Sequence, residues 1–251
     1  MPVCLIALGS NVDASEAVFL DALQELERRG AETLALSQIA TTRPVGSDAG
    51  SPYLNAAATV SSLLSPIELL RMLHRVEAAF GRIRTVHWGP RTLDLDLLLY
   101  GEEIADQPDL VIPHPAMWYR RFVLDPASEV GPEMLHPILK STVGELRRDI
   151  HVRPLHISLA LRAGDSAAPP DFNAAIARLN VDCKRIHWVI ADDEAEENAL
   201  CFASVILQRP SNSTPLRTQP HNPGDRSIII ESESAEQAYA QLSQLAAAIL
   251  G

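Results

Sequence analysis

The chain has 251 residues, 47% of them hydrophobic and 21% charged, and a formal net charge of -11, an ordinary composition for one large or two small folded domains. The acidic balance argues against nucleic acid as a partner, because tracking a phosphate backbone needs a basic surface. No apolar run reaches the roughly 18 residues that span a membrane, and the first residues lack the positive region of a signal peptide, so we expect a cytoplasmic protein. Cys4, Cys183 and Cys201 contain no Cys-x-x-Cys pair, which predicts buried thiols and neither a disulfide framework nor a zinc site.

The first fifty residues predict two strands around one helix. An apolar run at residues 3–8 predicts a buried strand. Asp13 is expected to cap the helix that follows, and Gly30 to end it. The buried stripe of this helix is expected to consist of Phe19, Ala22, Leu23 and Leu26. A second strand is expected within residues 33–41, and the turn formers of residues 43–52 predict a loop.

Residues 53–60 alternate in a way that predicts a strand with Tyr53 and Asn55 on one face. Two interpretations stay open for that face. Tyr53 can simply pack while Asn55 makes a local hydrogen bond, or the ring can be a platform for a flat heteroaromatic ligand whose edge is read by the amide. The next helix is expected to begin at Ser65 in a capping box and to end at Gly81. Its buried stripe is expected to be Leu69, Leu73, Val76 and Phe80.

The most informative stretch is the leucine run of residues 93–99, which contains Asp94 and Asp96. In a strand of period two these carboxylates face one side, roughly 7 Å apart at Cα. The leucines expected on the opposite, buried side are Leu93, Leu95, Leu97 and Leu99. An edge strand with two solvated carboxylates is the simple alternative. Because Asp is depleted in strands and like charges repel, we favour a site for Mg²⁺, which is usually held by one or two carboxylates plus substrate phosphates.

Arginines surround this acidic pair in the sequence, whereas the chain has only two lysines, Lys140 and Lys184. The arginines are Arg82, Arg84, Arg91, Arg120 and Arg121. Paired arginines are commonly a solvated face, and a histidine in a turn such as Pro113-His114-Pro115 is commonly structural. The preference for arginine nevertheless favours bidentate recognition of phosphate.

These segments together resemble the 6-hydroxymethyl-7,8-dihydropterin pyrophosphokinase family, whose members move the terminal pyrophosphate of ATP onto a pterin alcohol in folate biosynthesis. The resemblance covers about residues 1–150 and implies an α+β fold, a ferredoxin-like sandwich with a mainly antiparallel sheet. The motifs that carry it are Leu8-Gly9-Ser10-Asn11, Thr42 with Pro44-Val45-Gly46, Tyr53-Leu54-Asn55-Ala56, Glu77 with Gly81-Arg82, Trp88-Gly89-Pro90-Arg91-Thr92-Leu93-Asp94-Leu95-Asp96, Pro113-His114-Pro115, and Arg120 with Phe122.

The resemblance also implies roles for individual residues. Asp94 and Asp96 are expected to bind two Mg²⁺ ions, while Arg82 and Arg91 stabilise charge on the transferring group. The residues expected to contact the pterin are Thr42, Pro44, Val45, Tyr53, Asn55 and Phe122. Those expected on the ATP side are His74, Glu77, Arg84, Trp88, Leu97, His114 and Arg120. His74, His87 and Arg121 depart from residues common in the family.

Residues 151–251 lie beyond the resemblance and predict a small α/β appendage of unknown type. Expected strands lie at residues 154–161, 185–191 and 227–231, with a strand or buried helix at 199–207. A helix is expected at residues 171–179, a loop at 208–225, and a last helix capped at Ser234 with Tyr239, Leu242, Leu245 and Ile249 on one face. The segment contains no phosphate loop, metal cluster or nucleophile with its base. We expect it to stabilise the protein, to mediate self-association, or to bind a folate-pathway partner.

A rival to the enzyme is a non-catalytic sensor that binds a nucleotide or a pterin and regulates a partner through residues 151–251. Arg82 and Arg91 favour the enzyme, because a sensor needs no groups placed for charge in a transition state.

Overall fold

The computed structural model describes residues 1–11, 16–42, 52–81, 92–152, 155–161, 178–179, 185–190, 203–208, 226–232 and 234–250. The predicted cap at Asp13, residues 43–51 and 209–225 of the two predicted loops, and most of the helix at 171–179 therefore lie outside the described residues. Gln208, predicted to begin a loop, is the last residue of a strand. The chain divides into two compact units, Met1–Arg147 and Arg148–Leu250.

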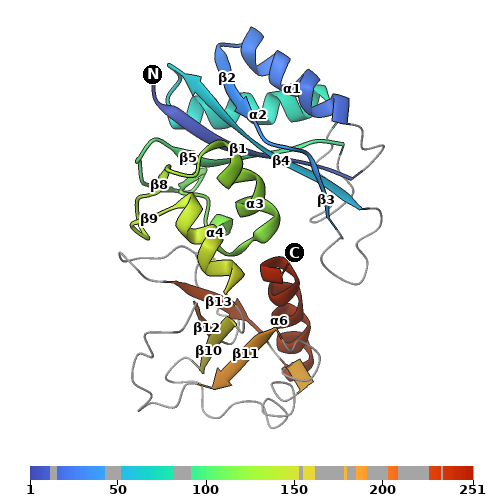
Figure 1. The fold of residues 1–251 in the computed structure, drawn as a ribbon, viewed down its shortest axis with the longest axis vertical. Helices are drawn as coiled ribbons and strands as arrows, with labels where there is room; N and C mark the ends of the chain where they lie inside the picture. Colours follow the sequence, from blue (N-terminus) through green and yellow to red (C-terminus); the bar gives the residue numbers. More distant parts are fainter. Residues whose placement is uncertain are drawn as a thin grey trace. The chain divides into compact units, whose positions relative to one another are not determined.

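The first unit is built on an antiparallel sheet with the strand order β2-β4-β1-β5. A further strand, β3, pairs with the N-terminal residues of β4. Helices α1 and α2 cover one face of this sheet and α3 lies on the other (Figure 1). The elements in chain order are β1 (Val3–Ser10), α1 (Glu16–Arg28), β2 (Ala31–Leu36), β3 (Ala40–Thr42), β4 (Tyr53–Ser62), α2 (Pro66–Ala79), β5 (Asp94–Tyr100), β6 (Ala105–Gln107), β7 (Leu110–Ile112), the 3₁₀ helix η1 (Met117–Tyr119), α3 (Arg121–Val130), β8 (Leu135–His136), β9 (Ser141–Thr142) and α4 (Val143–His151).

The ends of α1 and α2 confirm the local signals in the sequence. Gly30 and Gly81 follow the two helices with φ of 95° and 84°, a left-handed conformation that glycine adopts without a steric penalty. At the start of α2, Ser65 and Glu68 form the predicted capping box, and the Ser65 amide donates to Glu68 Oε2 at 2.9 Å. The stripe predicted for α1 is buried as expected.

Strand β4 is covered on both faces, which explains why small residues dominate it. Ala56, Ala58 and Val60 join the core beneath α1 and α2, as the alternation predicted. Ala57 and Thr59 point to the opposite face and are buried as well, on the side where α3 packs against β4. The sheet is thus the middle layer of a sandwich.

Leu99 is buried as predicted, but on the other face of the sheet, because β5 contains a β-bulge. Ile6 pairs with Leu97 while the preceding Leu5 pairs with Leu99, so Leu98 is an extra residue. Beyond the bulge the faces exchange. Leu93, Leu95 and Leu97 enter the core beneath α1 and α2, where Tyr100 takes the place predicted for Leu99. The Tyr100 hydroxyl donates to the Leu64 carbonyl at 2.6 Å.

The second unit contains a parallel sheet with the order β11-β10-β12-β13. Its elements are β10 (Leu155–Leu161), β11 (Ile186–Ile190), β12 (Ala203–Gln208), β13 (Ser227–Glu231) and α6 (Ala235–Leu250). The segment that the sequence left as a strand or a helix is therefore strand β12. Apolar side chains of the sheet and of α6 form the core, among them Ile157, Trp188, Val205, Leu242 and Ile249.

The described part of the chain bears on two expectations from composition, the lack of a membrane-spanning segment and the burial of the cysteine thiols. No helix there is long and apolar enough to cross a membrane. Cys4 is a buried free thiol, as expected. Burial, with a smaller contribution from the Glu103 carboxylate, raises the pKa of the Cys4 thiol to about 12. Cys183 and Cys201 lie outside the described residues.

Candidate functional site

Asp94 and Asp96 lie on the face of the sheet opposite α1 and α2, as their spacing predicted. Asp94 pairs with Gly9 of β1, and Gly9 pairs with Asn55 of β4. A Cβ atom at Gly9 would lie 3.7 Å from the Asp94 Cβ and 3.9 Å from the Asn55 Oδ1. Because Gly9 has no side chain, a carboxylate and an amide stand on either side of an open strip of backbone. Asp96 is in the next row, beside the half-buried Ala7.

Asn55 connects the row of Asn55, Gly9 and Asp94 to strand β3 by a side-chain hydrogen bond. Its Nδ2 donates to the Thr42 Oγ1 at 2.7 Å, and Thr42 pairs with Tyr53 in the β3–β4 ladder. Asn55 is only 8% exposed, whereas Thr42 and Tyr53 are half-buried. The structure thus brings together three of the residues predicted for the pterin, and it does so with the local hydrogen bond that the simpler interpretation expected.

Glu77 of α2 fastens the strand that carries the two aspartates. It is 1% exposed, and its Oε1 accepts a hydrogen bond of 2.8 Å from the Leu95 amide, between Asp94 and Asp96. Three residues before Leu95, the Thr92 hydroxyl donates to the Phe80 carbonyl at 2.8 Å. The structure therefore places the Glu77 carboxylate behind β5, on the core side. His74 lies half-buried one turn earlier on α2.

A pocket of about 280 Å³ opens beside Asp96. Three predicted site residues line it, namely Asp96, Leu97 and His114. The pocket is also lined by Pro115 of the predicted turn and by five residues without a predicted role, namely Leu70, Pro108, Asp109, Leu110 and Val111. The sequence signal that could have indicated them is the turn-forming pair Pro108-Asp109, because the short strand β7 (Leu110–Ile112) connects this turn to His114. The walls are mainly apolar, so the pocket suits a flat ring with a few polar edge atoms.

His114 is held at the edge of this pocket by two backbone contacts. Its amide donates to the Leu98 carbonyl at 2.9 Å, and its Nδ1 accepts from the Ala116 amide at 3.2 Å. Burial lowers the pKa of His114, and the Arg120 charge lowers it further, against an opposing effect of the Asp96 and Asp94 carboxylates. The imidazole is therefore neutral at pH 7, and with Nδ1 accepting, its proton is on Nε2. This nitrogen can donate to a ligand.

Arg120 and Phe122 stand together where α3 begins. The Arg120 Cζ lies 5.8 Å from the centroid of the Phe122 ring and 6.0 Å from that of Tyr119. Both distances are within the range of a cation–π contact. Arg120 also acts electrostatically on His114, so its charge reaches the pocket. The start of α3 thus contains Arg120, a predicted ATP contact, and Phe122, a predicted pterin contact.

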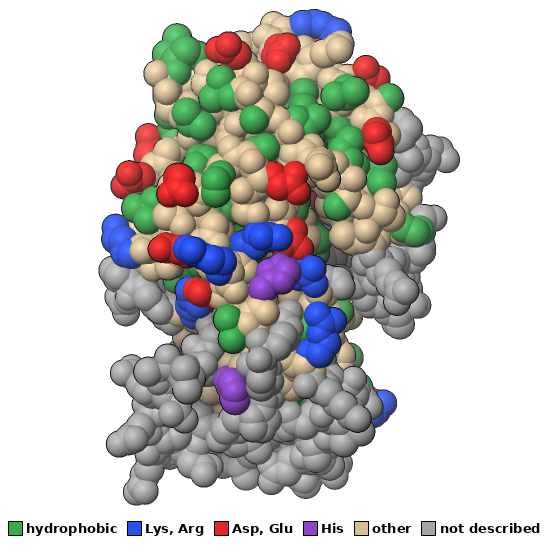
Figure 2. Space-filling view, in the orientation of Figure 1, with side chains coloured by type: hydrophobic (Ala, Val, Ile, Leu, Met, Phe, Trp, Pro, Cys, Tyr) green, Lys and Arg blue, Asp and Glu red, His purple; other side chains and the backbone are tan. Residues whose placement is uncertain are grey.

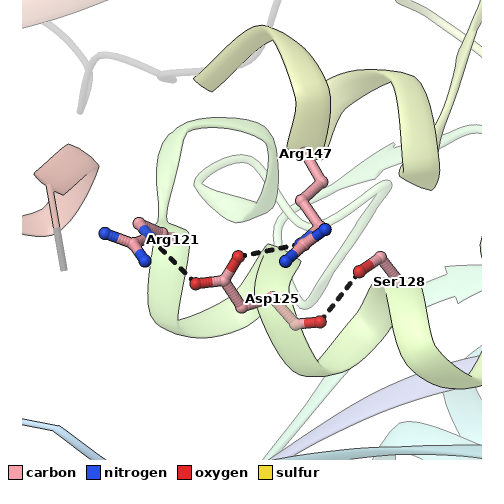
Figure 3. Close-up of polar contacts among 4 residues, drawn as sticks. All are labelled: Arg121, Asp125, Ser128 and Arg147. Atoms are coloured by element: carbon pink, nitrogen blue, oxygen red, sulfur yellow. Dashed lines mark hydrogen bonds and ion pairs between the residues drawn. The ribbon is translucent and has the colours of Figure 1, made fainter. Parts of the chain in front are cut away.

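Arg121 forms an ion pair within its own helix, unlike the phosphate-facing cation expected from the sequence. Its Nε lies 2.9 Å from Asp125 Oδ2, while Arg147 Nε of α4 lies 3.0 Å from Oδ1 of the same carboxylate (Figure 3). The Ser128 hydroxyl donates to the Asp125 carbonyl at 2.8 Å. Spacing of four residues on a helix brings Arg121 and Asp125 together. Lysine and arginine side chains gather around α3 and α4 on the face shown in Figure 2, and Asp125 neutralises part of that charge.

The donor set fits a divalent metal that completes its shell with ligand oxygens. Among the described residues no group of three or more His, Cys, Asp and Glu side chains forms a metal site. Two carboxylates on one open face are the set that Mg²⁺ uses when phosphate oxygens and water supply the remaining positions. We therefore expect weak metal binding in the absence of a nucleotide.

Six of the predicted site residues lie outside the described part of the chain, and their assignments stay predictions. They are Pro44, Val45, Arg82, Arg84, Trp88 and Arg91.

Comparison with known proteins gives consistent matches to the first unit. The model of the family described as 7,8-dihydro-6-hydroxymethylpterin-pyrophosphokinase (HPPK) matches residues 5–132, a range that contains every predicted site residue. A 2-amino-4-hydroxy-6-hydroxymethyldihydropteridine pyrophosphokinase from Bacillus subtilis is 40% identical over 129 residues, covering 51% of this chain and 77% of the relative. The protein of the same description from Pseudomonas aeruginosa is 38% identical, covering 53% and 82%. A crystal structure of Plasmodium falciparum HPPK-DHPS is 10% identical with a TM-score of 0.46, covering 83% of this chain and 64% of that one.

Proposed function

Since this chain belongs to the 7,8-dihydro-6-hydroxymethylpterin-pyrophosphokinase family, we propose that the sheet face carrying Asp94 and Asp96 is its active site. The chain catalyses transfer of pyrophosphate from ATP to 6-hydroxymethyl-7,8-dihydropterin, which gives AMP and the pterin diphosphate in folate biosynthesis. The observation that carries the assignment of the site is the row Asn55, Gly9 and Asp94 across three strands. In this row Asn55, a candidate pterin contact, and Asp94, a candidate metal ligand, are separated only by Gly9.

Asp94 and Asp96 would hold two Mg²⁺ ions against the ATP phosphates. When bound there, Mg²⁺ neutralises phosphate charge and polarises the group that is transferred. The two side chains project from one rigid strand whose backbone is fixed by Glu77, so their carboxylates are oriented before a nucleotide arrives. Arg82 and Arg91 remain the predicted cations for charge on the transferring group.

The pocket beside Asp96 suits the base of ATP. Leu70, Leu97 and Leu110 give apolar walls, and the His114 Nε2–H is a donor at its edge. The phosphates would then extend past Asp96 toward Arg120. The further ATP contacts predicted for His74, Arg84 and Trp88 belong to the same proposal. The prediction for Glu77 is corrected, because its carboxylate is buried on the core side and holds β5 instead.

The pterin would lie over the opposite end of the row. Tyr53 and Phe122 supply aromatic faces for its rings, while Asn55, Thr42 and the predicted contacts Pro44 and Val45 are placed for its polar edge. Asn55 Oδ1 faces the open strip at Gly9, which leaves a hydrogen-bond acceptor available there.

The test is to incubate the protein with ATP, Mg²⁺ and the reduced pterin alcohol and to measure AMP and pterin diphosphate. We expect both products in equal amounts, with turnover abolished by removal of Mg²⁺. Tight binding of both ligands without AMP would contradict the enzyme and support the sensor.

We also propose that the first unit is a ferredoxin-like sandwich. The order β1-α1-β2-β4-α2-β5 is the β-α-β-β-α-β arrangement of that fold. The strand order β2-β4-β1-β5 places the first and third strands of the motif side by side at the centre. This is where β1 and β4 present Gly9 and Asn55.

The aromatic clamp gives a prediction about binding selectivity. Tyr53→Ala or Phe122→Ala should weaken pterin binding by at least about fivefold, since each ring contributes on the order of 1 kcal/mol beyond its area burial. ATP affinity should change little. Titration calorimetry with each ligand measures both values. Tyr239→Ala, on α6 of the second unit, is the matched control and should change neither. Equal losses for both ligands in the clamp variants would indicate a folding defect instead.

The second unit gives a prediction about dispensability, because every candidate site residue lies between Thr42 and Phe122. A chain that ends at Val152 retains all of α4, including the buried Leu146 and Ile150. We expect it to keep the wild-type kcat and the KM values for ATP and pterin. Its solubility, stability or oligomeric state should change if residues 153–251 mediate self-association or bind a folate-pathway partner. A folded truncated protein that binds both ligands but has lost turnover would contradict this division.

A further inference from the structure

Tyr119 is a residue next to the site to which the sequence analysis gave no role. It ends η1, the turn between His114 and α3. Trp118, its neighbour, is 0% exposed, and the two rings meet edge to face with centroids 5.2 Å apart and planes at 85°. Because Trp118 is locked in the core, this contact fixes the orientation of the Tyr119 ring.

The Arg120 guanidinium lies within cation–π distance of two aromatic rings. Its Cζ is 6.0 Å from the centroid of Tyr119 and 5.8 Å from that of Phe122. Burial raises the pKa of Tyr119, and the Arg120 charge and its side-chain hydrogen bonding oppose this shift. The net direction is upward, so the ring carries a neutral hydroxyl and an electron-rich face at pH 7. The contact therefore has two parts, hydrogen bonding of Arg120 with the Tyr119 hydroxyl and an attraction between the cation and the neutral ring.

We propose that Tyr119 is a positioning residue for the reaction: its ring, braced by Trp118, holds the Arg120 guanidinium toward the ATP phosphates. An arginine without such contacts would lose rotamer freedom on binding a nucleotide, whereas a guanidinium that already contacts two rings has lost part of it beforehand. The inference rests on the proposed role of Arg120 on the ATP side. Tyr119 itself is not expected to touch the reacting atoms.

The test compares three substitutions in the full chain. Tyr119→Leu removes the ring and should raise KM for ATP, and Kd for a non-hydrolysable ATP analogue, by about three- to fivefold, the value of one cation–π contact. We expect kcat and the KM for pterin to stay unchanged. Tyr119→Phe keeps the ring but loses the hydrogen bond to Arg120, so it should recover part of the affinity that Tyr119→Leu loses. In an Arg120→Met background, Tyr119→Leu should have no further effect, because the partner is already gone.

Tyr100→Phe is the matched control, since it removes a tyrosine hydroxyl that donates to the Leu64 carbonyl on the other side of the sheet. It should lower Tm and leave ATP affinity unchanged. The proposal is overturned if Tyr119→Leu has the same effect with and without Arg120, weakens pterin binding equally, or leaves analogue binding unchanged. If the wild-type protein binds the analogue but forms no AMP, the proposed function fails while the binding experiment still decides the role of Tyr119.

Discussion

Asp94→Asn and Asp96→Asn should each lower kcat by about three orders of magnitude, because a metal ligand in this reaction contributes several kcal/mol to the transition state and 1.36 kcal/mol is a factor of ten. The substitution keeps the shape of the side chain and removes its charge. Both positions are half-buried on the open face of β5, so the fold should survive. The measurements are the Mg²⁺ dependence of turnover and the thermal unfolding midpoint.

Asp21→Asn is the matched control for these variants. Asp21 is an exposed aspartate on α1, and α1 covers the face of the sheet opposite the site. We expect normal turnover and an unchanged Mg²⁺ dependence. An Asp94 or Asp96 variant that behaved like the control would exclude that residue as a metal ligand.

Glu77→Ala should be the most destabilising single change at the site. It leaves the Leu95 amide without its acceptor in the core, which costs about 1–3 kcal/mol, a large part of the 5–15 kcal/mol typical for the unfolding of a domain. Because the freed amide lies between Asp94 and Asp96, kcat should fall as well. Glu77→Gln keeps an oxygen at the same position and should cost less. Urea unfolding measures the free energy, and the AMP assay measures kcat.

Glu129→Ala is the control, since the Glu129 Oε2 also accepts from a backbone amide, that of Gln38, at 2.8 Å. This bond is exposed, so water replaces it and the free energy of unfolding should change by less than about 1 kcal/mol. Equal losses in the Glu77 and Glu129 variants would show that burial of the Glu77 bond has no special weight.

Local signals in the sequence were sufficient for much of the first unit. A helix end depends on backbone groups within a few residues, so Ser65 with Glu68, and Gly30 and Gly81, located the ends of α1 and α2 correctly. The side on which a strand residue lies depends only on alternation, so Asp94 and Asp96 were placed on one face without knowledge of the neighbouring strands. The family resemblance had the same origin, since its motifs are contiguous.

Features that depend on partners distant in the chain could not be predicted. The bulge at Leu98 arises from the register between β5 and β1, and it moved Leu99 to the opposite face. The partner of Arg121 proved to be Asp125, which is shared with Arg147 of α4. The pocket beside Asp96 forms only because Leu70 of α2 and the residues around the Pro108-Asp109 turn, which are distant in the sequence, lie side by side in the fold. Alternation and capping act within one segment, whereas register, ion pairing and cavities are set by which segments meet, and only the tertiary structure decides that.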